Sequence, residues 1–279
     1  MRKLIPLLAV LVLAACGGSS TGEQGGGQAP APADLAASAV GALEEAGSAH
    51  YVFEVEVGGD AEEDSSDIGL RVEGDASKDA ATADVSVEFD GIGLSGTVLA
   101  NQDEVFVDFM GRWYGERGLR LGDRADEVPS EADVREYFGT LFTGTVAEGP
   151  AIDGAATWRF EGKLDADGFA DLTEKFEDEN VTAEQRALLR LVAEKTHFVL
   201  DVGQEDDLPR HVEFRLELSE EDVEALGDGL DVLGIGSRLG ENVAVSLDLS
   251  DFGTTVEYDA PSDYRPLDEL SDQLFGGLE

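Results

Sequence analysis

Hydrophobic and polar residues alternate along much of the chain. In the first such run, Phe53, Val55 and Val57 are separated by Glu54 and Glu56. A period of two indicates a strand that buries one of its faces. Similar runs follow at 68–72, 85–89, 92–98 and 105–109. Because Gly- and Asp-rich turns separate these runs, they predict an antiparallel meander that ends near residues 113–114.

A period of about 3.6 residues replaces the alternation in several segments. These segments are 35–46, 130–142, 169–176 and 183–194. Ser130 and Asp133 have the spacing of a capping box, as do Thr182 and Gln185, so we expect a helix to begin at each pair. The apolar residues between Val134 and Phe142 lie on one face of the second predicted helix.

Strands resume after the second predicted helix and again after the fourth. The predicted strands are 157–164, 197–202, 208–218, 243–249 and 255–258, the last of which ends before Pro261. The order of elements predicts an α+β fold in which a long, curved antiparallel sheet carries helices on one face. Such a sheet leaves an apolar hollow wherever helices do not fill its concave side.

The N-terminus has the pattern of a bacterial lipoprotein signal. Two basic residues precede the apolar run Leu4–Leu13. This run is too short to cross a bilayer, which needs about 20 residues. The sequence Leu13-Ala14-Ala15-Cys16 resembles the lipobox, in which the cysteine thiol receives a diacylglyceryl group and becomes the new N-terminus. We therefore expect residues 1–15 to be removed and the protein to be anchored by Cys16.

An ordinary secretory signal with a chance cysteine is the alternative interpretation. Cys16 is the only cysteine of the chain and directly follows the small residues, which favours lipidation. Two acyl chains on one residue give stable membrane attachment. The expected location is therefore the extracytoplasmic side of the cell membrane. With a single cysteine, no intramolecular disulfide can form.

The residues after Cys16 divide into a tether and a folded domain. Residues 17–34 are mostly Gly, Ser, Gln, Ala and Pro, and such a segment has an r.m.s. span of about 25 Å. The chain is 42% hydrophobic, which is too high for general disorder. Residues 16–34 are therefore predicted to form the lipidated linker, and residues 35–279 a single domain.

The charge of the chain excludes one class of partner. There are 61 acidic and 19 basic residues, giving a net charge of −42. Such a surface repels phosphate backbones, so nucleic-acid binding is not expected. Anionic lipid headgroups are repelled as well, so lipid contact has to come from the anchor or from apolar burial. A salty habitat and diffuse cation binding both remain open as reasons for the acidity.

Several short landmarks occur together in an order that resembles a known family. They are the lipobox, 46–51 ahead of the first strand, 104–107 ahead of Trp113, Ile152-Asp153-Gly154, Asp207-Leu208-Pro209, 249–253 and Ala260-Pro261. In this order they resemble the actinobacterial LppX/LprAFG lipoproteins, relatives in fold of the LolA and LolB lipoprotein carriers. The resemblance covers roughly residues 36–265.

The resemblance implies a half-barrel sheet closed by helices around a hydrophobic cavity that holds acyl chains of envelope lipids. We accordingly expect a monomer that binds and transports lipids or other hydrophobic molecules. The candidates for lining the cavity are large aromatic residues: Phe53, Phe109, Trp113, Phe138, Phe142, Trp158, Phe160, Phe198 and Phe214. Filling an ordinary core is the alternative role for each of them. The chain departs from the family in its acidity and in an acidic tail after Pro266.

Candidates for catalytic, metal or cofactor chemistry are weak. His50, His197 and His211 have no ligand partner at metal-binding spacing. The segment 165–168 suggests a calcium loop but misses its offsets, and 234–240 misses the dinucleotide fingerprint. A G-x-S-x-G elbow and a P-loop are absent from the sequence. We therefore predict no enzyme, no cofactor and no metal; a fully packed structural or signalling lipoprotein and a hydrolase are the rival hypotheses.

Overall fold

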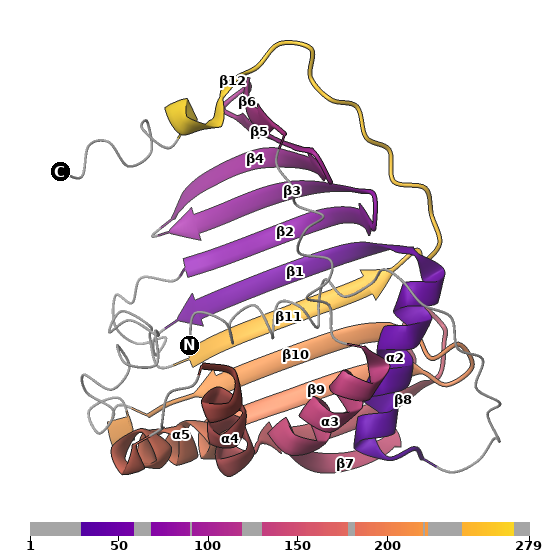
Figure 1. Ribbon diagram of the computed structural model, residues 1–279, viewed down its shortest axis with the longest axis vertical. Coiled ribbons are helices and arrows are strands. Elements are labelled where there is room, and N and C mark those ends of the chain that lie inside the picture. Colours follow the sequence, from indigo (N-terminus) through magenta and orange to yellow (C-terminus); the bar gives the residue numbers. More distant parts are fainter. Residues whose placement is uncertain are drawn as a thin grey trace.

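The computed structural model describes residues 29–58, 68–89, 91–118, 130–177, 182–219, 221–222 and 242–270. One sheet of twelve strands runs through them, with helices against one of its faces (Figure 1). The predicted α+β fold class, with an open antiparallel sheet, is therefore confirmed. The predicted signal peptide, Cys16 and most of the tether lie outside the described residues, so lipidation and the domain boundaries stay predictions.

The sheet consists of two meanders that meet in its middle. The strands are β1 (Ser48–Gly58), β2 (Ile68–Ser77), β3 (Ala80–Phe89), β4 (Ile92–Asn101), β5 (Glu104–Phe109), β6 (Arg112–Arg117), β7 (Phe142–Glu148), β8 (Thr157–Leu164), β9 (Thr196–Gly203), β10 (Pro209–Glu217), β11 (Asn242–Ser250) and β12 (Arg265–Pro266). Their order in the sheet is β12-β6-β5-β4-β3-β2-β1-β11-β10-β9-β8-β7. The pairing of β1 with β11 thus joins the N-terminal meander to the C-terminal one. Only β12 pairs in parallel, with β6.

The two faces of the sheet differ in chemistry because the predicted alternation is present in the strands. Phe53 on β1 lies opposite Val72 on β2 and Leu247 on β11. The next residue, Glu54, lies opposite Arg71 and Ser246. We call the face with Phe53 the inner face and the face with Glu54 the outer face. The inner face is the one that the helices cover.

The helices lie over the half of the sheet formed by β7 to β10 (Figure 1). They are α2 (Pro32–Ala46), α3 (Glu131–Leu141), α4 (Ala166–Glu177) and α5 (Ala183–Lys195). Both predicted capping boxes are present, at the start of α3 and of α5. Helix α2 begins three residues before its predicted start, since a proline fits the first helical turn. Within the described residues, every helix is too short or too polar to cross a membrane.

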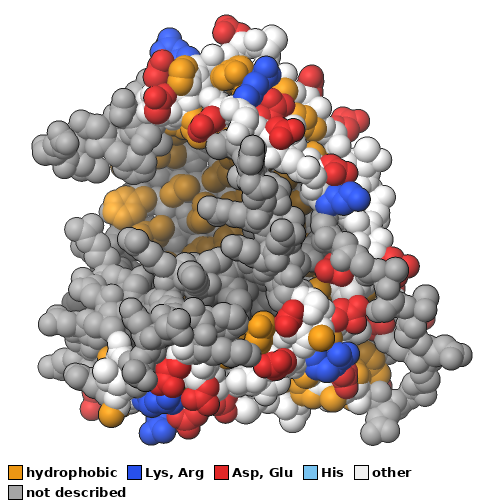
Figure 2. Space-filling view, in the orientation of Figure 1, with side chains coloured by type: hydrophobic (Ala, Val, Ile, Leu, Met, Phe, Trp, Pro, Cys, Tyr) orange, Lys and Arg blue, Asp and Glu red, His pale blue; other side chains and the backbone are white. Residues whose placement is uncertain are grey.

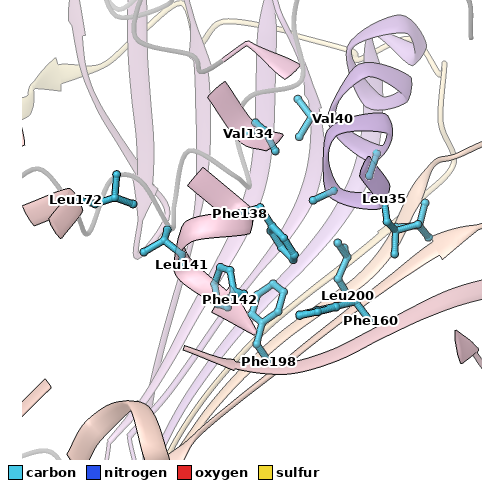
Figure 3. Close-up of a cluster of buried hydrophobic side chains, with 13 residues drawn as sticks. Leu35, Val40, Val134, Phe138, Leu141, Phe142, Phe160, Leu172, Phe198 and Leu200 are labelled. Atoms are coloured by element: carbon cyan, nitrogen blue, oxygen red, sulfur yellow. The ribbon is translucent and has the colours of Figure 1, made fainter. Parts of the chain in front are cut away.

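A cluster of four phenylalanines forms the centre of the core beneath α2 and α3 (Figure 3). The ring of Phe142 stacks on that of Phe198, with 4.4 Å between centroids. Phe138 of α3 lies 4.9 Å from Phe142 and 5.1 Å from Phe160. Leu35 of α2 is 1% exposed and belongs to the same cluster. Burial of these rings fixes both helices to the sheet.

Phe160 fits into the core because two glycines lie beneath its ring. A Cβ atom added to Gly162 would come 2.7 Å from Phe160 Cε1 and 2.6 Å from the Thr143 carbonyl oxygen. One added to Gly144 would come 2.7 Å from Phe160 Cε2 and 2.6 Å from the Gly162 Cα of the paired strand. Carbon atoms do not approach so closely without displacement. The two glycines on β7 and β8 therefore allow a fully buried ring to lie flat against the sheet.

The segment after β11 runs to the far edge of the sheet (yellow in Figure 1). There Tyr264 packs edge-on against Phe106, with 4.9 Å between ring centroids. The Arg117 guanidinium lies 5.4 Å from the Phe106 ring and 5.2 Å from the Tyr264 ring. The Tyr258 hydroxyl donates a hydrogen bond of 3.0 Å to Glu104. These contacts cover the outer face of β5 and attach β12 to the edge strand β6.

Two predicted elements are wrong in detail. Residues 255–258 are not a strand, because β1 and β10 already occupy both sides of β11 and leave no edge for a further hairpin. Phe142 is not helical: α3 ends at Leu141, and Phe142 has extended backbone angles and begins β7. Strand β7 escaped prediction because its residues Thr143-Gly144-Thr145 carry no apolar side chain.

Replacing Gly162 by alanine is expected to destabilise the protein. The added methyl group forces the Phe160 ring off the sheet, which we expect to lower the free energy of unfolding by about 1–3 kcal/mol in urea denaturation. Gly69→Ala is the matched control, since its Cβ would lie no closer than 3.8 Å, to Glu88 Cβ. Equal losses in the two variants would contradict this account of the core.

The Tyr258 contact predicts an unusual tyrosine titration. Burial and the hydrogen bond to the Glu104 carboxylate raise the pKa of Tyr258 from 10.0 to about 12. The contact therefore stabilises the fold fully below pH 10 and is lost as the pH rises through about 12. In an ultraviolet absorbance titration, Tyr258→Phe should remove a tyrosine that ionises near pH 12. Glu104→Gln should lower the pKa of Tyr258; a titration unchanged by both substitutions would argue against the contact.

Candidate functional site

The apolar inner face continues beyond the helices, across β1 to β4. Directly paired residues form three apolar rows: Val57–Ile68–Phe89–Ile92, Val55–Leu70–Val87–Leu94 and Phe53–Val72–Val85. Side chains that are paired across an antiparallel sheet point to the same face. The rows therefore form one hydrophobic surface. Figure 2 shows hydrophobic side chains inside a hollow below the upper strands.

The exposure of these side chains rises toward the β3–β4 turn. Val57 is only 8% exposed, whereas Val87 is 36% and Leu94 46% exposed. Phe89 is 47% and Ile92 65% exposed. Large apolar side chains of a packed core are almost completely buried. This part of the inner face is thus a hydrophobic surface that the fold itself does not cover completely.

The connections of the helices explain why this surface is uncovered. Helix α3 ends at Leu141 and β7 begins at the next residue; α5 ends at Lys195 and β9 begins at the next residue. One residue separates β8 from α4, and one separates α2 from β1. The links of α3, α4 and α5 hold these helices beside β7, β8 and β9, and α2 packs against α3. They leave the inner face of β2 to β5 free of described helices (Figure 1).

Among the described residues, few polar groups lie on the inner face. Tyr51 lies on the inner face, one pair of residues from Phe53, and packs beside Leu247 and Leu249. Burial, and secondarily the negative charge of Asp75, raise the pKa of the Tyr51 hydroxyl. The Tyr51 hydroxyl is therefore neutral near pH 7 and adds no charge to the inner face.

Charged side chains are concentrated on the outer face instead. Arg71 forms ion pairs with Glu54 and, at 2.8 Å, with Glu73. The hydrogen bonds from Arg71 hold the pKa of Glu73 below its usual value. His50 Nδ1 lies 3.0 Å from Asp75 Oδ1. These pairs keep the outer face hydrated and distinguish it from the apolar inner face.

Two depressions on the outer face have volumes of about 490 and 460 Å³. The walls of both carry carboxylates: the first includes Glu73, Asp84 and Asp108, and the second includes Glu54 and Glu88 beside several aliphatic residues. An acyl chain would gain little there, because carboxylates would lose water without a partner. The hollow of the inner face is therefore the better candidate for a hydrophobic ligand.

The nine aromatic residues proposed from the sequence lie in different surroundings. Phe138, Phe142, Phe160 and Phe198 are buried and pack against one another in the core. Trp158 and Phe214 are partly buried at the edge of this cluster. The structure thus brings six of the nine together beneath the helices.

The remaining three are on strands of the N-terminal meander. Phe53 and Phe109 belong to the inner face beyond the helices, since Phe109 pairs with Gly96 and Gly96 with Val85. Trp113 pairs with Asp108 and so belongs to the outer face, away from the hollow. Neighbouring residues of β6 point to opposite faces. Tyr114 pairs with Val107 of the inner face, so the adjacent Trp113 points to the outer face.

Reasoning from the sequence missed the aliphatic residues that make up most of the surface. Val55, Leu70, Val72, Val85 and Leu94 were visible as members of alternating runs. They were not among the candidates because only large aromatic residues were considered. Their signal was the period of two, which already predicted one continuous apolar face on each strand.

Other candidate sites have structural explanations. Asp165 accepts a hydrogen bond from the Gly168 N–H at the start of α4, which fits a turn before a helix. His211 Nδ1 lies 2.7 Å from Asp248 on the outer face. Among the described residues there is no group of three or more His, Cys, Asp or Glu that could hold a metal. The segment 234–240 lies outside the described residues.

Asp201 is the one fully buried carboxylate of the described residues. It accepts two hydrogen bonds from Arg159, of 2.8 Å to Oδ1 and 2.7 Å to Oδ2. The bond to Asp201 raises the pKa of the Arg159 guanidinium. The two groups form a bidentate ion pair, and this pairing explains why a carboxylate can be buried here.

Comparison with known proteins finds similarity among solved structures. None of the family models and none of the curated proteins matches the chain. The lipoprotein LppX of Mycobacterium tuberculosis is 13% identical, with a TM-score of 0.42 over 82% of this chain and 99% of its own. LprF of Mycobacterium bovis is 13% identical, with a TM-score of 0.41 over 85% of this chain and 100% of its own. A LolA superfamily protein of Nitrosomonas europaea is 12% identical, with a TM-score of 0.19 over 77% and 87%.

These structures include the lipoproteins that the sequence landmarks resemble. The chain is similar to LppX and LprF. Its own fold is the open α+β sheet described above.

Proposed function

We propose that the protein is a lipid-anchored lipoprotein of the cell envelope that binds the acyl chains of lipids in the hollow of the inner face. It acts as a carrier and performs no covalent chemistry. The observation that carries this proposal is the apolar surface of β1 to β4, whose residues Val87 and Leu94 stay 36% and 46% exposed in the folded chain. A soluble domain gains nothing from such a surface unless something apolar covers it.

The energetics of burial support an acyl chain as the ligand. Each methylene group that leaves water gains about 0.8 kcal/mol. The inner face offers aliphatic side chains on several strands. Tyr51 supplies a polar group next to the Phe53–Val72–Val85 row, at the side farthest from the β3–β4 turn. A ligand with a long apolar chain and a small polar head matches this distribution.

The anchor and the charge complete the proposal. Acylation of Cys16 would hold the domain on the extracytoplasmic side of the membrane, within reach of its ligand. A net charge of −42 disfavours contact between copies, so the protein acts as a monomer. The likeness to lipoproteins of known structure is consistent with this role.

Replacing Val85 by aspartate is expected to abolish lipid binding. Val85 lies in the middle of the inner face, between Val72 and Gly96. A carboxylate there would be desolvated by an acyl chain without a partner, so the bound lipid should fall more than about tenfold. Native mass spectrometry with lipid extraction measures the bound mass. Ser86→Asp is the matched control, because the adjacent residue points to the outer face.

Three results would count against the proposal. Equal lipid content in the Val85→Asp and Ser86→Asp proteins, both with unchanged melting temperature, would remove the hollow as the site. If the unsubstituted protein carries no lipid and added phospholipid does not raise its melting temperature, a packed structural lipoprotein is the better explanation. Turnover of an ester substrate that a substitution in the protein abolishes would favour a hydrolase.

A further inference from the structure

The β3–β4 hairpin carries the most exposed hydrophobic residues of the inner face. Phe89 pairs with Ile92 at the end of the hairpin, and Val87 pairs with Leu94 one step further in. Their exposed fractions are 47%, 65%, 36% and 46%. The turn includes Gly91, whose φ of 75° suits a tight hairpin. The four side chains form one patch, which we call the hairpin patch.

The hairpin patch is continuous with the hollow. Phe89 and Val87 pair with Ile68 and Leu70 on β2, and these pair with Val57 and Val55 on β1. Along these rows the exposure falls from the hairpin toward β1, where Val57 is 8% exposed. An acyl chain that moves along this path stays in contact with apolar side chains. Exposure of methylene groups to water, which is the main cost of moving a lipid, is thereby reduced.

The charged side chains on the described strands of the hairpin lie on the face opposite the patch. Residues 80–101 include no Lys or Arg. Asp84 and Glu88 belong to the outer face, since they pair with Thr97 and Gly93. The hairpin is thus amphipathic, with an apolar inner side and an acidic outer side. Such a patch can enter a bilayer surface by apolar burial, whereas anionic headgroups give it no attraction.

The lipid surface fits the hairpin patch better than a second copy does. Two copies, each with a net charge of −42, repel one another on approach. The patch lies in the middle of the sheet rather than on an edge strand, so a protein partner could not extend the sheet there. The predicted tether of residues 17–34, with an r.m.s. span of about 25 Å, would keep the hairpin close to the membrane.

We propose that the hairpin patch is a membrane-contacting rim, which inserts into the bilayer surface and gives lipid chains a path into the hollow. The second half of this statement rests on the proposed function, while the insertion itself does not. Phe89 and Ile92 are the residues that enter the bilayer surface, and Val87 and Leu94 connect them to the hollow.

The test uses the mature chain, residues 16–279, with Cys16→Ser so that no acyl anchor contributes. The protein is mixed with phosphatidylcholine vesicles and floated in a density gradient. We expect it to float, and the substitution pair Phe89→Ser and Ile92→Ser to reduce the floated fraction about tenfold or more. Met110→Ser is the matched control: Met110 is 80% exposed but lines a depression of the outer face, so its loss should have no effect.

Further measurements separate this proposal from the proposed function. The Phe89→Ser/Ile92→Ser protein should still take up phospholipid offered in detergent micelles, as measured by native mass spectrometry. A protein that floats but carries no lipid supports the rim and refutes the carrier function. A protein that carries lipid but does not float refutes the rim. Ile92→Ser alone, at the most exposed position, tests the rim with the smallest risk to folding and should lower the floated fraction.

Other outcomes overturn the proposal directly. Equal flotation of the double variant and the unsubstituted chain would show that the hairpin makes no contact. Binding that appears only with anionic phosphatidylglycerol vesicles would point to electrostatic attraction instead. Dimers in gel filtration that the double substitution separates, without any flotation, would assign the patch to a second copy of the chain.

Discussion

The pairing of β1 with β11 is the interaction on which the rest of the structure depends. It joins strands that are about 190 residues apart in the chain, with Phe53 opposite Leu247 and Val55 opposite Val245. This register puts the apolar positions of both meanders on the same face. A shift by one residue would place Glu54 of β1 beside the leucines of β11 and divide the inner face in two.

The uneven cover of this face follows from the chain connections. Helices α3, α4 and α5 are linked to β7, β8 and β9 by at most one residue, so they pack where those strands lie. The phenylalanine cluster around Phe142 and Phe198 fixes α3 over the C-terminal meander. Strands β2 to β5 of the N-terminal meander keep their apolar side chains, but no described helix lies over them to bury these side chains (Figure 1). The same sheet therefore has a packed core at one end and a hydrophobic hollow at the other.

The outer face makes this arrangement soluble. Its ion pairs, such as Arg71 with Glu73, and its excess of carboxylates keep one side of the sheet in water while the other side is apolar. The edge strand β6 is protected by β12 and by the packing of Tyr264 on Phe106. A sheet with an exposed apolar face and unprotected edges would aggregate, so these features accompany the hollow.

The sequence alone determined most of the local structure, because most strands and helices carry their own period and α3 and α5 carry their own caps. The alternation around Phe53 and the capping box at Ser130 are visible in a few neighbouring residues, and both are present in the structure. The α+β class followed from their order. The lipoprotein signal that predicts lipidation of Cys16 is likewise contained in a short stretch of neighbouring residues.

Only the tertiary structure decided which apolar residues are buried by the protein and which remain available. Phe198 and Phe89 look alike in the sequence, yet one is 3% and the other 47% exposed. The pairing of β1 with β11 and the short helix connections cause this difference, and neither has a signal in local periodicity. Likewise Trp113 lies on the outer face because of its place in the pleat. Burial depends on contacts between distant parts of the chain, so it is a property of the fold rather than of any single segment.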